Sequence, residues 1–141
     1  MSMFSAYDIS ALGLEIEMQR MQTIAANIAN VNTTRNENGY LYTPKTLVSN
    51  LQFDQLIQGE MNTHTLSSAV NLIDKDIPTK LVYEPKHPRA DANGYVEYPN
   101  VNTADEMLSM LKTVRVYEAN IRAMNVAKAM AQRAIEIGSK R

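Results

Sequence analysis

The residues best suited to chemistry are two carboxylates and a histidine in one short stretch of the chain. Glu84, His87 and Asp91 lie close together, while His64, the second histidine, is far away in the sequence. Histidine and carboxylate side chains can bind zinc or transfer protons. Their spacing here does not fit one face of a helix, and the chain has no HExxH motif. The sequence therefore predicts neither a catalytic site nor a metal site.

This stretch is better explained as a rigid turn. Pro85 and Pro88 fix the backbone on either side of His87. We interpret His87 as a turn residue whose ring packs against Tyr83 or Tyr95. A small enzyme that uses His87 remains an alternative at this point.

Composition excludes several classes of protein. The 141 residues carry a net charge of -1, which gives no electrostatic reason to bind nucleic acid or an anionic membrane. The chain has no cysteine, so disulfides and thiolate metal sites are excluded. It has five glycines and no recognisable phosphate-binding loop, and we expect no cofactor and no small-molecule substrate. With no tryptophan and nine methionines, soft helix seams are favoured over a large rigid core.

The last third of the chain predicts one long helix over residues 103–137. Thr103 followed by Glu106 has the spacing of a capping box, and Gly138 is the first helix breaker beyond it. Apolar residues recur at steps of three and four, the spacing of a coiled-coil seam. They are Met107, Met110, Val114, Tyr117, Ile121 and Met124.

A partner helix is predicted over residues 3–29, where Asn30 and Asn32 end it. Its seam has the same spacing and consists of Phe4, Tyr7, Ala11, Leu14, Met18, Met21, Ala25 and Ile28. Two seams of similar length predict a mainly α fold in which the N- and C-terminal helices form a coiled-coil hairpin.

The first helix also carries a second apolar stripe. Ile9, Leu12 and Ile16 lie nearly opposite Tyr7 and Leu14 on the helical wheel. A two-helix hairpin buries one stripe per helix, so we expect this second stripe to face outward and to contact copies or relatives of the chain. The alternative is that the middle of the chain folds back over both faces.

The middle of the chain predicts a small β unit of four or five short antiparallel strands. Asn38-Gly39 is a hairpin signal that leads into a strand at 40–42, followed by strands at 46–48, 70–73, 80–83 and 95–98. Residues 50–68 fit neither a loop nor a short helix clearly. We therefore divide the chain into an N-terminal helix at 1–32, a β-rich middle at 33–102 and a C-terminal helix at 103–141.

Asparagines crowd the first helix end and recur in the last helix. Asn27, Asn30 and Asn32 are the first group, and Asn120 and Asn125 are the second. They either cap helices and face solvent or form hydrogen bonds between helices and fix their register.

One asparagine-rich run carries a family resemblance. Residues 25–33, AANIANVNT, resemble the N-terminal signature shared by bacterial flagellar rod and hook proteins. Short motifs narrow the likeness to proximal-rod subunits: YEP at 83–85, HP at 87–88, AD at 90–91, GYV at 94–96 and PNVN at 99–102. YEAN at 117–120 continues it, so the resemblance covers nearly the whole chain.

The resemblance implies a structural subunit of the flagellar basal-body rod, the driveshaft between rotor and hook in the cell envelope. It implies export in an unfolded form through the flagellar type III apparatus without a cleaved signal, and residues 1–9 lack the features of a signal peptide. The implied partners are copies of the chain, other rod subunits, rotor-ring proteins and export-apparatus proteins. The alternatives are a cytosolic helical adaptor or export chaperone, and a different rod subunit of the same family.

Two sets of residues are predicted to make the contacts. The predicted subunit interface comprises Phe4, Tyr7, Ile9, Leu12, Leu14, Ile16, Met21, Asn27, Ile28, Asn30, Met110, Val114, Tyr117, Asn120, Ile121, Met124, Met130 and Ile137. The family-specific turn comprises Tyr83, Pro85, His87, Pro88, Asp91, Gly94, Pro99 and Asn100. We expect this turn to contact a neighbouring subunit or ring.

Overall fold

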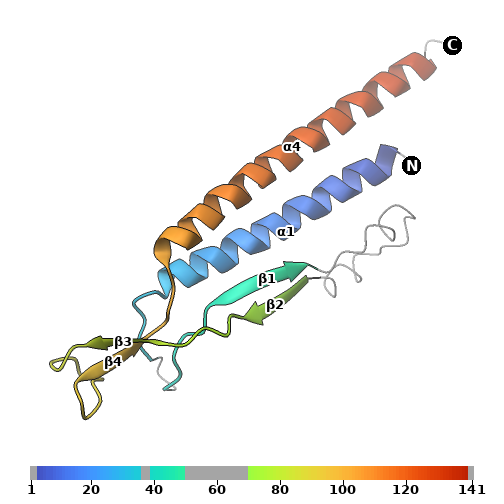
Figure 1. The fold of residues 1–141 in the computed structure, drawn as a ribbon. Coiled ribbons are helices and arrows are strands. Elements are labelled where there is room, and N and C mark those ends of the chain that lie inside the picture. The colour runs from blue at the N-terminus through green and yellow to red at the C-terminus, as the bar shows by residue number, and fades with distance from the viewer. Residues whose placement is uncertain (1–2, 36–38, 50–69, 140–141) are drawn as a thin grey trace.

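A computed structural model describes residues 3–35, 39–49 and 70–139. Two long helices, α1 (Met3–Ala29) and α4 (Thr103–Ser139), lie side by side and run in opposite directions (Figure 1). Between them in sequence come the strands β1 (Lys45–Ser49), β2 (Val70–Asp74), β3 (Lys80–Tyr83) and β4 (Tyr95–Tyr98). The predicted fold of two terminal helices with short antiparallel strands between them is confirmed.

The bounds of α1 agree with the prediction, and the residues after it show why it ends. The Asn30 side chain donates a hydrogen bond to the Ala26 carbonyl at 2.8 Å, which occupies an acceptor at the open end of the helix. The Thr33 amide then donates to the Asn30 carbonyl at 3.0 Å, which turns the chain away.

The start of α4 has a different cap from the predicted one. The Asn102 side-chain oxygen accepts the Ala104 N–H at 3.1 Å, so Asn102 is the N-cap. The Glu106 carboxylate does not reach back to the cap, because it bonds to Asn27 and Lys75 instead. The predicted Thr103–Glu106 capping box is therefore wrong. The helix also continues through Gly138 to Ser139, two residues beyond its predicted end.

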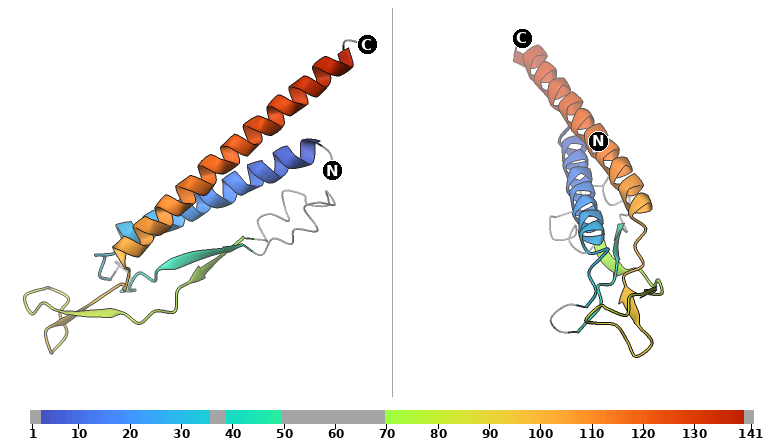
Figure 2. Two further views of the ribbon diagram at one scale, coloured as in Figure 1. Left: turned by 45° about the horizontal axis from the view of Figure 1, so that its top comes forward. Right: turned by 90° about the vertical axis from the view of Figure 1, so that its left-hand side faces the viewer.

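The two helices differ in length. Helix α4 has 37 residues and α1 has 27, about 55 and 40 Å at a rise of 1.5 Å per residue. Both views in Figure 2 show the C-terminal end of α4 extending past the start of α1. The last turns of α4 therefore have no cover from α1.

The stripe of α1 that faces inward is the second stripe, which was predicted to face outward. Leu12, Ile16 and Ile24 are buried, whereas Tyr7 and Met18 of the predicted seam are each 45% exposed. The inward side also carries Asn27, which contacts α4, so the polar contact and the apolar stripe share one face. The prediction that Ile9, Leu12 and Ile16 face outward is therefore wrong, because a helical wheel with two apolar stripes does not say which stripe is inside.

The predicted seam of α4 is closer to the observed packing. Met110, Val114, Tyr117, Ile121 and Met124 are half-buried along the helix, but Met107 is 57% exposed. Glu106 and Thr113 are more deeply buried than any apolar residue of α4. Gly13 of α1 lies so close to Asn120 that a side-chain carbon at Gly13 would come within 2.7 Å of the Asn120 nitrogen. The side-by-side packing of the helices is thus partly polar.

The described strands form two separate two-stranded ladders and not the one small β unit that the sequence predicted. Strand β1 pairs antiparallel with β2, with Leu47 opposite Leu72, and β3 pairs antiparallel with β4, with Val82 opposite Val96. The β1–β2 ladder lies along α1, and the β3–β4 ladder lies beyond the adjoining ends of the two helices (Figure 1). In the described part of the middle region, β1 therefore packs along α1, and Lys75 after β2 reaches Glu106 of α4.

The strand predicted at 40–42 does not form. Leu41 makes a single antiparallel bridge with Arg35, and Gly39 has a φ of 81°, which suits the turn that its glycine predicted. Asn38, His64 and the ambiguous segment 50–68 lie outside the described residues.

We expect the buried stripe of α1 to govern the stability of the free chain. Replacing Ile16 with Ala should lower the free energy of unfolding by about 2–5 kcal/mol, because it leaves a cavity. Replacing the outward Met18 with Ala should change it by less than about 0.5 kcal/mol. Urea unfolding of the purified chain, followed by circular dichroism, measures both. A larger loss for Met18→Ala than for Ile16→Ala would contradict the observed facing of α1.

Candidate functional site

The most densely bonded residue of the described structure is Asn27, which is 1% exposed. Its side-chain nitrogen donates to the Lys45 carbonyl at 2.8 Å and to the Glu106 carboxylate at 3.2 Å. Its side-chain oxygen accepts the Tyr42 hydroxyl at 2.8 Å and the Lys45 amide at 2.9 Å. One amide thus joins α1 to β1, to the segment before β1 and to α4.

Glu106 extends this cluster to the segment after β2. Its carboxylate is 8% exposed and forms an ion pair with the Lys75 ammonium. The Lys75 amide also donates to the Pro44 carbonyl at 2.7 Å. A buried carboxylate needs such partners, because burial without them costs several kcal/mol. We call Asn27, Tyr42, Lys45, Lys75 and Glu106 the polar junction.

The electrostatics of the polar junction keep Tyr42 protonated. Burial raises the pKa of Tyr42, and the Glu106 and Asp74 carboxylates raise it further, while the Lys45 ammonium lowers it. The hydroxyl therefore remains a donor to Asn27. Higher along α1, the buried Glu17 pairs with Arg20 at 3.3 Å.

The asparagines divide between the two expected roles. Asn27 bonds across to α4, so the prediction of a buried inter-helix asparagine is confirmed for this residue. Asn30 caps its own helix instead. Asn120 lies against Gly13, and Asn32 and Asn125 are exposed.

The family-specific turn is ordered by hydrogen bonds from backbone amides to the Asp91 side chain. The Asp91 carboxylate accepts the Asn93 and Tyr95 amides at 2.9 and 2.8 Å. Gly94 has a φ of 83°, and a side-chain carbon there would come within 2.9 Å of the Tyr83 ring. This position therefore requires glycine for its conformation and for the close approach.

The remaining residues of the turn serve the same geometry. The rings of Tyr83 and Tyr95 meet edge to face at a centroid distance of 5.3 Å. His87 is a turn residue, as predicted, and its ring nitrogen accepts the Arg89 amide at 3.2 Å. The aromatic contact in this turn joins Tyr83 to Tyr95 and does not involve His87. Pro99 is buried, His87 and Gly94 are half-buried, and Tyr83, Pro85, Pro88, Asp91 and Asn100 are exposed.

Tyr98, in β4, faces a carboxylate. Its hydroxyl donates to Glu84 at 3.2 Å. Desolvation and this hydrogen bond raise the pKa of Tyr98.

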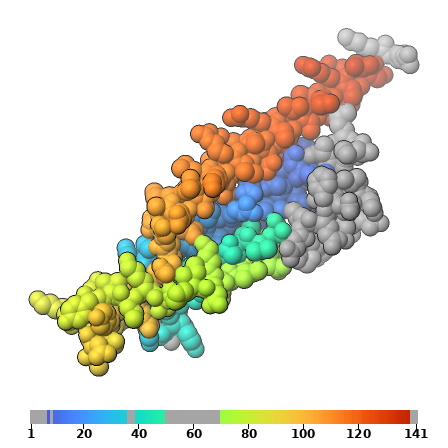
Figure 3. All heavy atoms as spheres, viewed as in Figure 1, coloured from blue at the N-terminus to red at the C-terminus, as the bar shows by residue number. Residues whose placement is uncertain are grey.

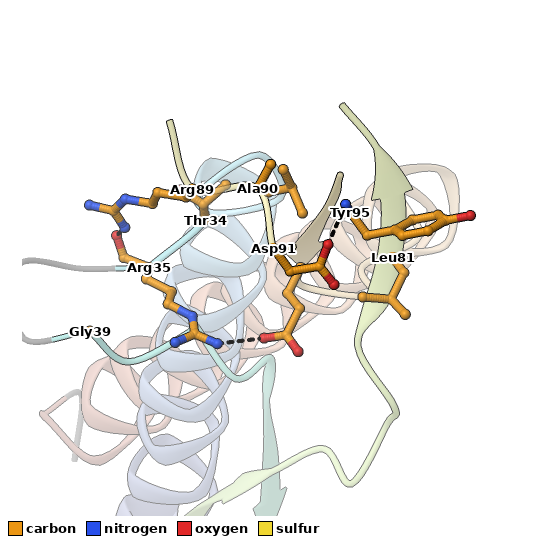
Figure 4. A pocket seen from close by; sticks show the side chains of 10 residues that line it. Thr34, Arg35, Gly39, Leu81, Arg89, Ala90, Asp91 and Tyr95 are labelled. Atoms are coloured by element: carbon orange, nitrogen blue, oxygen red, sulfur yellow. Dashed lines mark hydrogen bonds and ion pairs between the residues drawn. The ribbon is translucent and has the colours of Figure 1, made fainter. Parts of the chain in front are cut away.

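A cleft of about 530 Å³ separates the turn from Thr34, Arg35 and Gly39 (Figure 4). Its charged groups already have partners: Arg35 pairs with Glu97 at 2.9 Å, and the Arg89 guanidinium donates to the Arg35 carbonyl. Figure 4 also shows the Asp91 carboxylate bonded to the Tyr95 amide. The cleft offers little chemistry to a ligand. Among the described residues, no group of three or more histidines and carboxylates could hold a metal ion.

The predicted interface residues fall into three groups. Leu12, Ile16 and Asn27 are buried within the chain. Ile9, Leu14, Met21, Ile28, Asn30, Met110, Val114, Tyr117, Asn120, Ile121 and Met124 are half-buried. Tyr7, Met130 and Ile137 are exposed, and the side chain of Phe4 lies outside the described part of α1.

Each of the two long helices also has an outward face with exposed apolar residues. The outer α1 stripe consists of the exposed residues Tyr7, Ala11, Met18, Ala25 and Ala29. The outer α4 stripe consists of the exposed residues Leu108, Val116, Ala119, Ala123, Val126, Met130 and Ile137. Figure 3 shows the atoms of α4 forming one edge of the molecule beyond those of α1.

Sequence reasoning missed most of the outer α4 stripe. The exposed fractions of Leu108, Val116 and Val126 are 52%, 45% and 58%. These residues share one side of the helical wheel, so the sequence contained the signal. It was overlooked because lysines and arginines lie on the same side. No helix in the described parts of the chain is long and apolar enough to span a membrane.

Two protein-family models match the chain at its ends. Residues 10–35 match the model described as flagella basal body rod protein, and residues 92–137 match the model described as flagellar basal body rod FlgEFG protein C-terminal. These segments contain most of α1 and of α4. The two packed helices are therefore those of a flagellar basal-body rod protein.

Curated relatives narrow the class. The chain is 34% identical to the flagellar basal-body rod protein FlgC of Salmonella typhimurium over 138 residues, which cover 98% of this chain and 99% of the relative. The FlgC proteins of Bacillus subtilis and Aquifex aeolicus are also each 34% identical, with at least 96% of both chains covered. The chain belongs to the FlgC family of flagellar basal-body rod proteins. It is a structural subunit of the rod and not an enzyme. Membership of this family favours a rod subunit over the alternatives of a cytosolic adaptor and an export chaperone.

The polar junction predicts a specific loss of stability. Replacing Asn27 with Ala leaves the Tyr42 hydroxyl, the Lys45 amide and the Glu106 carboxylate short of a partner, so we expect a loss of about 2–4 kcal/mol in the free energy of unfolding. Asn30→Ala, on the same helix end, removes an exposed capping contact and should cost no more than about 1 kcal/mol. Urea unfolding compares the two variants, and equal losses would refute the role of Asn27.

Proposed function

We propose that the outer stripes of α1 and α4 are the surfaces by which this rod subunit packs against its neighbours and passes torque along the rod. The observation that carries this proposal is exposed apolar surface. Met18 is 45% exposed, Met130 60% and Ile137 74%, each on the outward side of its helix. Covering such side chains contributes about 1.5–3 kcal/mol for each one that becomes fully buried.

The predicted interface set changes in consequence. Leu12 and Ile16 are already covered by the chain itself, so their role in assembly is to hold α1 in place. The residues proposed for direct contact are those of the two outer stripes, with Tyr7, Met130 and Ile137 kept from the original set. Their steps are mostly three, four or seven, which keeps each stripe on one side of its helix and suits packing between helices.

We extend the proposal to the path of the torque. The polar junction fixes the helix pair to β1 and to the segment after β2, so force applied to the outer stripes passes to the rest of the subunit through hydrogen bonds of 2.8 to 3.2 Å. The proposed division at 1–32, 33–102 and 103–141 follows this arrangement of helical ends around a β-rich middle.

Export is also part of the proposal. We propose export through the flagellar type III apparatus without a cleaved signal, into the periplasmic part of the basal body. The buried apolar core of the described residues is small, consisting of Leu12, Ile16, Ile24 and Val96. A small core favours unfolding for passage, and the outer stripes supply further stability after assembly.

A charge on the outer α1 stripe should block assembly without unfolding the subunit. Met18→Glu keeps a good helix former at an exposed position but places a carboxylate where a neighbour is proposed to pack. In cells that lack the wild-type gene, we expect loss of this chain from purified basal bodies and loss of motility. Thr79→Glu, exposed in the segment before β3, should assemble normally. Normal incorporation of Met18→Glu, with an unchanged urea midpoint, would contradict the proposal.

The family-specific turn is proposed to contact a neighbouring subunit or a rotor ring. Pro85 and Pro88 are exposed and hold its shape. Replacing both with Gly should raise the flexibility of the turn and weaken the assembled rod, measured as release of rods from basal bodies under detergent or mild acid. Unchanged rod stability and swimming torque would remove this contact from the proposal.

A further inference from the structure

We propose that the outer α1 stripe of one copy receives the outer α4 stripe of a second copy, in a contact that joins unlike surfaces. This inference rests on the proposed function and names which surface meets which. Its first support is the length of the helices: α4 has 37 residues and α1 has 27, so the end of α4 extends beyond its own partner helix (Figure 2). Met130 and Ile137 lie in that part, 60% and 74% exposed.

The second support is the size of the side chains on the two stripes. Ala11, Ala25 and Ala29 are exposed on α1, and Ala119 and Ala123 are exposed on α4. Small residues on both surfaces let two helix axes approach to the short end of the usual 8–10 Å range. The larger residues, Met18 on one stripe and Val126 on the other, can then pack into the spaces between them.

The third support is charge, which selects unlike surfaces over like ones. The side of α4 that carries the outer α4 stripe also carries the exposed Lys112, Arg115, Arg122 and Arg133. Of these, Arg115 pairs with Glu118 at 3.0 Å. Two α4 surfaces placed together would bring these cations against each other, which is unfavourable. On α1, Glu15 is exposed beside the outer α1 stripe, whereas the buried Glu17 pairs with Arg20 away from that stripe. A contact between α1 and α4 of different copies is therefore complementary.

The geometry of such a contact has a consequence for assembly. When each copy uses its two outer stripes on two different neighbours, the contact repeats from copy to copy, either closing into a ring or continuing as an open helix. This is the behaviour that a subunit of a rod needs.

The chain has no cysteine, so introduced cysteines report the contact directly. Cells without the wild-type gene are made to produce two versions together: a tagged chain with Met18→Cys, and an untagged chain with one cysteine at Leu108, Ala119, Val126 or Met130. The scan along α4 is needed because the axial register between copies is free to vary. Ala25→Cys is the second probe on α1, in case Met18→Cys disturbs assembly. Disulfides form only when the two Cα atoms are roughly 4.4–6.8 Å apart.

The expected result is a disulfide-linked pair of one tagged and one untagged chain in purified basal bodies, at one or more scan positions, and its loss when either version is produced alone. Thr79→Cys in place of the α4 cysteine is the matched control and should give no linked pair. Pairs that link only like positions, links to another protein, or no link across the whole scan in basal bodies that contain the chain would overturn the inference. Absence of the chain from basal bodies would instead count against the proposed function.

Discussion

The structure depends on the cost of burying the side-chain amide of Asn27. An amide that is 1% exposed must have its hydrogen bonds, and Asn27 finds them on the backbone of β1, on Tyr42 and on Glu106. Glu106 is held in turn by Lys75. These requirements fix the rotation of α1 about its axis, because only one rotation points Asn27 at all of its partners. Once that rotation is fixed, Leu12 and Ile16 turn inward, and Met18 turns outward.

Much of the secondary structure followed from the sequence, while the pairing of its elements did not. The bounds of α1, β3 and β4 match the prediction, because proline, glycine and asparagine mark their ends clearly. The strand residues did not reveal that β1 pairs with β2 and β3 with β4, since short exposed strands carry little register information. The cap of α4 was misassigned for a related reason: Glu106 had the spacing of a capping residue, but the buried Asn27 and Lys75 offered it stronger partners.

The sequence did not predict which apolar stripe of α1 lies inward. Both apolar stripes of this helix have helical spacing, so periodicity alone could not choose between them. The deciding signal was Asn27, which shares a face with Ile16 and Ile9 and not with Met18. The hypothesis of a buried asparagine between helices was correct, and combining it with the helical wheel would have selected the right stripe. The outer α4 stripe was missed because its apolar residues are interspersed with lysine and arginine.

The two faces of each helix thus have different duties. The inner faces hold the subunit together through a small apolar core and the polar junction, and the outer faces are proposed to complete their burial in the rod. Methionine oxidation tests this division most directly, because oxidation to the sulfoxide follows solvent exposure and the chain carries methionines on both faces. Mass spectrometry should find Met18 and Met130 oxidised faster than the half-buried Met110 and Met124 in the free chain, and Met18 and Met130 protected in assembled basal bodies. Equal oxidation of Met18 and Met130 in the free and assembled states would contradict the account.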